Sequence, residues 1–222
     1  MRRFDVITFD CYGTLVDWEG GIRRAFDEAA GAAGRTIPEG YAVRAHAETE
    51  PEVEASGYRS YRQVLGETAT RVAAGLGWRL GRDETDFLAA SVPFWEPFPD
   101  TNAALVRLAD AGLTLGILSN VDDGLLEATR QHFPIHFDLL VTAEQVRSYK
   151  PAHAHFLAAR ERIGQRSWLH AAQSYFHDVV PALQLGIPVA WVNRKREPAG
   201  PQGPPLHETS DLSALADWVI AD

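Results

Sequence analysis

Short groups of polar residues stand where apolar stretches of the chain end, and their residue types could carry out nucleophilic chemistry. A carboxylate that is held in place and partly neutralised can act as a nucleophile, forming an ester that water then opens. We expect Asp10 to be this nucleophile; alternatively, its side chain caps the next turn through local hydrogen bonds. The polar groups are residues 10–17 (DCYGTLVD), 119–120 (SN), 149–151 (YKP) and 174–178 (SYFHD).

Lys150 is the residue that could balance the charge of Asp10. Opposite charges within a few ångströms favour the charged form of a carboxylate, so a lysine held near Asp10 would keep it ionised and oriented. The alternative is an ordinary surface lysine. The setting of Lys150 between Tyr149 and Pro151 argues against that alternative.

Five apolar, β-rich runs predict the strands that would position these polar groups. Each adjoins a stretch with helical apolar spacing, which indicates βαβ units and therefore an α/β fold with a doubly wound parallel sheet. Ligands of such sheets bind beyond the carboxyl ends of the strands, and this is where the polar groups stand. The predicted strands are residues 4–10 (FDVITFD), 113–118 (LTLGIL), 138–142 (DLLVT), 168–173 (WLHAAQ) and 187–192 (IPVAWV).

The pattern changes between Asp17 and Pro97, where no strand is predicted and the apolar positions fit helices. A Pro-rich stretch at 93–100 would return the chain to the sheet, since closely spaced prolines disfavour both an α-helix and the hydrogen bonding of a β-strand. We therefore expect a core domain of residues 1–16 and 98–222 and a helical cap domain of residues 17–97. The expected cap helices cover 22–33, 41–55, 58–76 and 84–95; a surface loop at 197–205 and a last helix at 211–221 complete the core.

The amino-acid composition excludes several classes of function for this protein. The chain has 222 residues, 45% of them hydrophobic, which is enough for one sizeable core or a core and a small lobe. A net charge of −9 provides no overall basic field, so we expect neither nucleic acid nor a membrane as a partner. Cys11 is the only cysteine, which excludes an internal disulfide and a cysteine-based metal cluster. The amino-terminal residues lack the pattern of a secretory signal, and we expect a cytoplasmic protein.

The order of the four polar groups resembles that of the hydrolases of the HAD superfamily: D-x-x-G-T-L-x-D after a first strand, S-N after a second, then Y-K-P and an acidic loop. The resemblance covers nearly the whole chain. It implies a Rossmann-like core with a helical cap inserted after the first strand, and a catalytic set of Asp10, Thr14, Ser119, Lys150 and Asp178.

Within that resemblance, Thr14 would hold one oxygen of the nucleophile, and Asp178 would hold Lys150 and help to position the water that attacks the ester. Ser119 and Asn120 could bind a substrate carboxylate or a departing halide. Each residue also has a local alternative. Thr14 could cap its own turn, and Ser119, Asn120 and Asp178 could cap turns or helices.

Two positions favour the L-2-haloacid dehalogenase branch over the phosphatases of the superfamily. Phosphatases carry a second Asp where Tyr12 stands, and a tyrosine with a pKa of about 10 is a poor acid for a leaving alcohol. Halide needs no proton to leave. Ser174 stands where phosphatases place a carboxylate ligand of Mg²⁺, so the resemblance implies no metal and no cofactor. Tyr12 and Ser174 are then expected to contact substrate, and Tyr12 could also be a packing residue.

The family also uses a cap arginine to meet the substrate. Arg44 stands at about the expected distance after Asp10, with Arg59 and Arg62 as competitors and a solvated surface arginine as the alternative for each.

Other positions depart from the dehalogenase pattern, which has tyrosine at Phe156, asparagine at Tyr175 and often an aromatic residue at His177. His177 could pass a proton to a leaving group, or pack inside the fold.

Three hypotheses follow from these residues. The first is the hydrolysis of a small 2-haloacid to a 2-hydroxy acid through an ester on Asp10. The second is a HAD phosphatase that tolerates Tyr12 and Ser174, and the third is a non-catalytic binding protein with the same fold. For the first, the partners are a small anionic substrate and, because similar enzymes often pair, a second copy of the chain in a homodimer.

Overall fold

A single parallel sheet forms the centre of the protein, whose computed structural model describes residues 3–221. Its strand order is β3-β2-β1-β4-β5-β6, so β1 lies between β2 and β4, where the order reverses. The strands are β1 (Val6–Phe9), β2 (Thr114–Ser119), β3 (Leu139–Thr142), β4 (Trp168–Ala172), β5 (Val189–Val192) and β6 (His207–Thr209).

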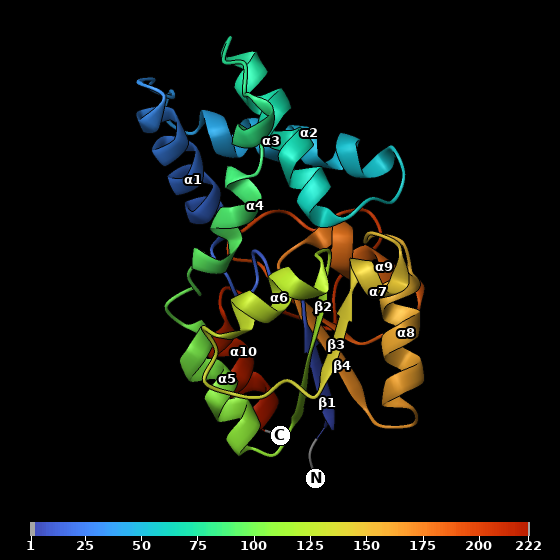
Figure 1. The fold of residues 1–222 in the computed structure, drawn as a ribbon. Coiled ribbons are helices and arrows are strands. Elements are labelled where there is room, and N and C mark those ends of the chain that lie inside the picture. Colours follow the sequence, from blue (N-terminus) through green and yellow to red (C-terminus); the bar gives the residue numbers. More distant parts are fainter. Residues whose placement is uncertain (1–2, 222) are drawn as a thin grey trace.

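Helices cover both faces of this sheet, as a doubly wound fold requires (Figure 1). Alternate residues of β1 are therefore buried on opposite faces: Ile7 and Phe9 in one apolar cluster, Val6 in the other. On the first face lie α5 (Thr101–Asp110), α6 (Asp123–Arg130) and α10 (Leu212–Ile220). On the second lie α8 (Ala154–Ile163) and α9 (Val180–Gln184), with the short α7 (Ala143–Val146) after β3.

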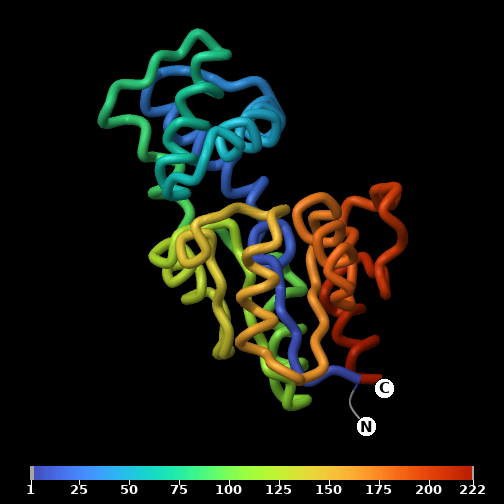
Figure 2. The backbone as a smooth tube through the Cα atoms, turned by 90° about the vertical axis from the view of Figure 1, so that its right-hand side faces the viewer, coloured from blue at the N-terminus to red at the C-terminus, as the bar shows by residue number. Residues whose placement is uncertain are grey.

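The helices between β1 and α5 gather above the carboxyl ends of the strands, away from the two chain ends (Figure 2). They are α1 (Trp18–Ala32), α2 (Tyr41–Ala55), α3 (Tyr61–Gly75) and α4 (Phe87–Ser91), with 3-10 turns at Arg82–Glu84 and Val92–Phe94. Their apolar faces pack on one another: α2 rests on α3, and α4 contacts α1 and α3. No helix among residues 3–221 is long and apolar enough to cross a lipid bilayer.

The chain leaves and re-enters the sheet layer through two segments that lie side by side. Asp17 N–H donates to the Glu96 carbonyl over 2.9 Å, and Phe98 N–H donates to the Leu15 carbonyl over 3.0 Å. We propose on this ground that residues 17–97 act as one cap domain on a core of 1–16 and 98–222. Residues 1, 2 and 222 lie outside the described part of the chain.

The predicted α/β fold with a parallel sheet is confirmed, although local details differ from the sequence prediction. The edge strand β6 was not predicted, since three residues give no periodicity to read. The helix expected at 84–95 is shorter, because Pro93 lies in the 3-10 turn that follows α4. Asp178 lies inside a π-helical turn, Tyr175–Val179, and not simply at the start of a helix.

Gly116 of β2 gives a test of how tightly the sheet is packed. A Cβ atom at this position would lie 2.9 Å from both Cβ and the carbonyl oxygen of Leu139 on β3. Gly116→Ala is therefore expected to lower the free energy of unfolding by about 1–3 kcal/mol in urea denaturation. The control is Gly124→Ala in α6, where no atom outside the adjacent residues and the local helix backbone lies within 4 Å of the new methyl group. Equal stability of the two variants would contradict this account of the packing.

Candidate active site

A cavity of about 410 Å³ opens at the carboxyl ends of the central strands, beneath α2. Its position follows from the strand order, because the loops after β1 and its neighbours diverge where the order reverses. Eight of the ten residues singled out in the sequence line it: Asp10, Tyr12, Ser119, Asn120, Lys150, Ser174, His177 and Asp178.

Asp10 directly follows β1, and both of its carboxylate oxygens accept hydrogen bonds. Oδ1 accepts from Lys150 Nζ over 2.9 Å, and Oδ2 accepts from the Thr14 hydroxyl over 2.9 Å. The Thr14 oxygen in turn accepts from the Gln173 N–H over 2.8 Å, which turns its hydrogen toward Asp10. Burial and the charge of Asp178 raise the pKa of Asp10, while Lys150 and Thr14 oppose that rise. Thr14 is fully buried and does not line the cavity, and its hydrogen bond fixes the orientation of the carboxylate.

Lys150 joins the two buried carboxylates of the site. Its ammonium donates to Asp10 Oδ1 over 2.9 Å, to Asp178 Oδ1 over 2.7 Å and to the Leu118 carbonyl over 2.9 Å, so all three N–H bonds are used. Only 2% of Lys150 is exposed. Burial alone would lower its pKa, but the two carboxylates raise that pKa above the ordinary value. Lys150 is therefore charged and held rigidly.

Asp178 is equally buried and has one oxygen free. Although burial favours its neutral form, Lys150 and a hydrogen bond from His170 lower its pKa below the ordinary value, so it stays ionised. Oδ1 accepts both of these bonds, whereas Oδ2 has no partner among the described residues. Asp178 is among the residues that line the cavity, and Oδ2 is its unpartnered oxygen.

His170 of β4 is a residue that the sequence analysis missed. Trp168 can only donate its indole N–H, so the Thr8 hydroxyl accepts it over 2.8 Å and donates to His170 Nδ1 over 2.9 Å. His170 Nε2 then carries the hydrogen and donates to Asp178 over 3.1 Å. The signal in the sequence was a histidine inside a buried strand, but its pairing with Thr8 follows only from the register of β1 and β4.

Ser119 and Asn120 follow β2 and play different parts in this geometry. Ser119 is fully buried and belongs to the cavity lining, and its hydroxyl has no hydrogen-bond partner among the described residues. The Asn120 amide is already used, since Oδ1 accepts from the Lys150 N–H over 2.7 Å and Nδ2 donates to the Lys150 carbonyl over 3.1 Å. Asn120 therefore braces the backbone of Lys150.

Tyr12, Ser174 and His177 reach the cavity but also bind neighbours in the protein. The Tyr12 hydroxyl shares a 2.8 Å hydrogen bond with Thr129, and its ring packs edge-on against Trp95. The Ser174 oxygen accepts from the His177 N–H over 3.0 Å, which leaves its hydrogen for His177 Nδ1 at 3.0 Å. Burial lowers the pKa of His177, so this ring favours its neutral form.

Arg44 is the predicted contact that the structure does not bring into the site. It is exposed on α2 and does not line the cavity. The two other candidate arginines do not line the cavity either. Arg59 binds Glu67, and Arg62 lines a separate hollow on the surface. The α2 wall of the cavity carries His46, Glu50 and Glu54. The resemblance placed an arginine at this wall by its distance from Asp10, and that distance does not determine which face of α2 is turned inward.

No three His, Cys, Asp or Glu side chains within residues 3–221 lie together as the ligands of a metal ion would. Ser174 occupies the position at which a further carboxylate would be needed, and its oxygen is bound to His177. The positive charge next to Asp10 and Asp178 is the Lys150 ammonium.

Known proteins resemble most or nearly all of the chain. A family profile described as haloacid dehalogenase-like hydrolase matches residues 4–172. An (S)-2-haloacid dehalogenase of Pseudomonas putida is 30% identical over 226 residues, covering 99% of this chain and all of the relative. A solved L-2-haloacid dehalogenase of Xanthobacter autotrophicus, with chloropropionic acid covalently bound, has 21% identity and a TM-score of 0.81, covering 97% of this chain and 98% of the other.

The stability of the Lys150 cluster can be tested with a matched pair of variants. Lys150→Met leaves two buried carboxylates without a cation and is expected to cost about 3–5 kcal/mol of unfolding free energy. Lys195→Met removes a half-exposed lysine that pairs with Glu19 on the surface, at a cost below about 1 kcal/mol. Urea denaturation at neutral pH measures both. Similar losses in the two variants would show that Lys150 does not balance buried charge.

Proposed function

We propose, because the chain belongs to the family of haloacid dehalogenase-like hydrolases, that it hydrolyses a small 2-haloacid to a 2-hydroxy acid and halide. Its named relatives include (S)-2-haloacid dehalogenases and a haloacetate dehalogenase of a Moraxella species. The observation that carries the proposal is the 2.9 Å contact between Lys150 and Asp10, which supplies a nucleophile and its counter-charge without a metal.

In the first step an oxygen of Asp10 attacks the carbon that bears the halogen. The new C–O bond forms as the carbon–halogen bond breaks, and the bonding electron pair leaves with the halide. Lys150 and Thr14 hold the carboxylate oxygens in place, so little orientation has to be gained in the transition state. No proton is needed by the halide, which fits a site with Tyr12 in place of an acid.

In the second step water attacks the carbonyl carbon of the ester on Asp10. Asp178 Oδ2, which is buried and unpartnered, accepts a hydrogen bond from this water and passes its proton to the departing alkoxide. The 2-hydroxy acid leaves with an oxygen that belonged to Asp10. The oxygen from water remains in the carboxyl group of Asp10, whose remaining proton passes to solvent as the carboxylate is regenerated.

A phosphate ester fits this arrangement less well. A multiply charged phosphate next to Asp10 and Asp178 would meet two carboxylates and a single ammonium, whereas phosphoryl transfer relies on cations to relieve that repulsion. A haloacid carries one charge, set away from the reacting carbon. The expected cytoplasmic location and the homodimer remain predictions from the sequence.

The reaction can be tested by halide release from 2-chloropropionate in the presence of EDTA. The wild-type protein is expected to release chloride at an unchanged rate with EDTA, because Lys150 supplies the positive charge. Asp10→Asn is expected to lose at least about a thousandfold in kcat/KM, since no ester can form. In a single turnover in ¹⁸O-labelled water, the product hydroxyl should be unlabelled.

Glu48→Gln on the exposed side of α2 serves as the control variant and should keep the wild-type rate. The proposal fails if Asp10→Asn retains activity, or if the first-turnover product contains ¹⁸O in its hydroxyl group.

His170 is expected to position Asp178 for the second step. His170→Leu removes a donor that lowers the pKa of Asp178, so the acidic limb of the pH profile of kcat should move to higher pH. We expect a loss of about 10- to 100-fold in kcat, as for outer partners of other catalytic groups. An initial burst of halide should remain, because the first step is intact.

His170→Gln, whose side-chain amide can still donate to Asp178, should recover much of the lost rate. If both variants keep the wild-type pH profile, His170 only fills space in the core.

A further inference from the structure

The end of the cavity that is formed by the cap helices carries negatively charged side chains, which is unusual for an enzyme that acts on anionic substrates. Glu50 and Glu54 of α2 both line it, and no arginine does so among residues 3–221. The two lysines that reach the cavity are engaged: Lys150 with its three acceptors, and Lys195 with Glu19 at 2.5 Å. An anionic group at this end would therefore lie beside Glu50 and Glu54, with Lys195 paired to Glu19.

The spacing of residues on α2 explains how these groups come together. His46, Glu50 and Glu54 are four residues apart, so they lie on one face of the helix, and this face is turned toward the cavity. Glu50 accepts a 2.6 Å hydrogen bond from the Tyr61 hydroxyl. Burial, followed by the charge of Glu50, raises the pKa of Glu54 to about 9. A cation between the two groups would favour the charged form of both.

His46 supplies an independent sign that this end of the cavity receives a ligand. Only 1% of the residue is exposed, it lines the cavity, and neither ring nitrogen has a hydrogen-bond partner among the described residues. The nearest carboxylate oxygen, on Glu50, is 3.6 Å from Nε2. Burial lowers the pKa of His46, so the ring is neutral at neutral pH and can accept a hydrogen bond.

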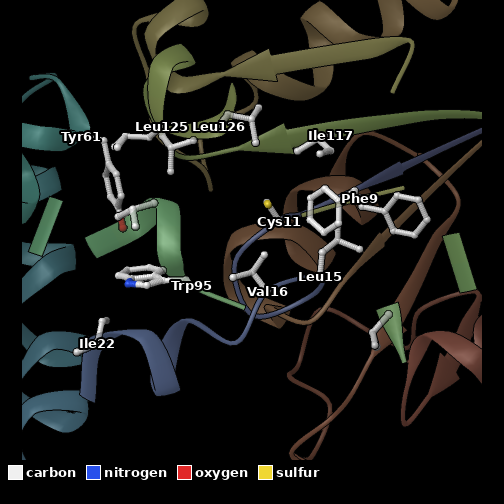
Figure 3. Close-up of a cluster of buried hydrophobic side chains, with 14 of the residues drawn as sticks. Phe9, Cys11, Leu15, Val16, Ile22, Tyr61, Trp95, Ile117, Leu125 and Leu126 are labelled. Carbon is white, nitrogen blue, oxygen red and sulfur yellow. The ribbon is translucent and has the colours of Figure 1, made fainter. Parts of the chain in front are cut away.

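Aromatic rings complete the wall. Tyr61, Trp95 and Ile22 all line the cavity, and Figure 3 draws them on the cap side of the apolar cluster. Trp18 packs beside the His46 ring, with 5.8 Å between ring centroids. Carboxylates combined with the faces of aromatic rings are the groups that bind an ammonium ion, through charge and through cation–π attraction.

We propose that this end of the cavity is an ammonium subsite, and that the substrate is a 2-haloacid whose carbon chain ends in a primary ammonium group. The reacting carbon lies at Asp10, the carboxylate lies on the core side near the free Ser119 hydroxyl, and the ammonium lies between Glu50, Glu54 and the rings. The cavity of about 410 Å³ has room for such a longer chain. This inference rests on the proposed function for the reacting end only.

Binding of unreactive analogues tests the subsite without any chemistry. Titration calorimetry on the wild-type protein would compare 4-aminobutanoate, 5-aminopentanoate and 6-aminohexanoate with pentanoate, hexanoate and heptanoate, in which a methyl group replaces the ammonium. At least one amino acid of the series should bind about tenfold more tightly than its alkyl partner. If every alkyl acid binds as tightly as its amino partner, the proposal is wrong.

Halide release then connects the subsite to turnover. The kcat/KM for 6-amino-2-chlorohexanoate should exceed that for 2-chloroheptanoate about tenfold, and the Glu50→Gln/Glu54→Gln double variant should abolish this preference. Glu48→Gln, one exposed carboxylate on the same helix, should keep it. Urea denaturation of the double variant checks that it is folded.

The outcomes separate the two proposals. Equal rates for the amino and alkyl substrates in the wild-type protein would overturn the subsite and leave the dehalogenase proposal standing. If no haloacid is turned over, the proposed function fails, and the calorimetric comparison alone decides whether the ammonium subsite exists.

Discussion

One ammonium group shared between two buried carboxylates is the interaction on which the site depends. Lys150 contacts Asp10 at 2.9 Å and Asp178 at 2.7 Å, and less than a tenth of each of the three residues is exposed. Burying three charges is costly unless each is paired and hydrogen-bonded. The surrounding structure meets that condition through Thr14, the Leu118 carbonyl, His170 and the brace from Asn120.

In the proposed reaction, the same arrangement divides the chemistry between the two acids. Asp10 has hydrogen bonds to both oxygens and lines the cavity, as a fixed nucleophile must. Asp178 has one oxygen bound and one free, as a group that orients water must. Once Asp10 is esterified it carries no charge, and Lys150 is left paired with Asp178 alone. The charges of Lys150 and Asp178 then balance each other, and Asp178 can orient the water that attacks the ester.

Much of the fold and the centre of the site could be predicted from the sequence. Five apolar runs predicted five of the six strands, and the convergence of carboxyl ends in a parallel sheet predicts that Asp10, Ser119 and Asp178 approach one another. The structure brings these residues and Lys150 to one cavity. Their catalytic roles remain proposals.

What could not be predicted depends on contacts distant in the sequence or on the rotation of a helix. His170 and Thr8 are 162 positions apart and meet only through the register of two strands. Arg44 and Glu50 lie on the same helix, and only the packing of α2 on its neighbours decides which of them faces Asp10. Helix periodicity shows which residues share a face, but not what that face covers.

The central claim is that Asp10 forms an ester while Asp178 is needed to open it. Mass spectrometry of Asp178→Asn protein after incubation with 2-chloropropionate tests this claim most directly. The account predicts that the peptide containing Asp10 gains the mass of the substrate without its halogen. Chloride release with no added mass on that peptide, or with the added mass on a different residue, would contradict it.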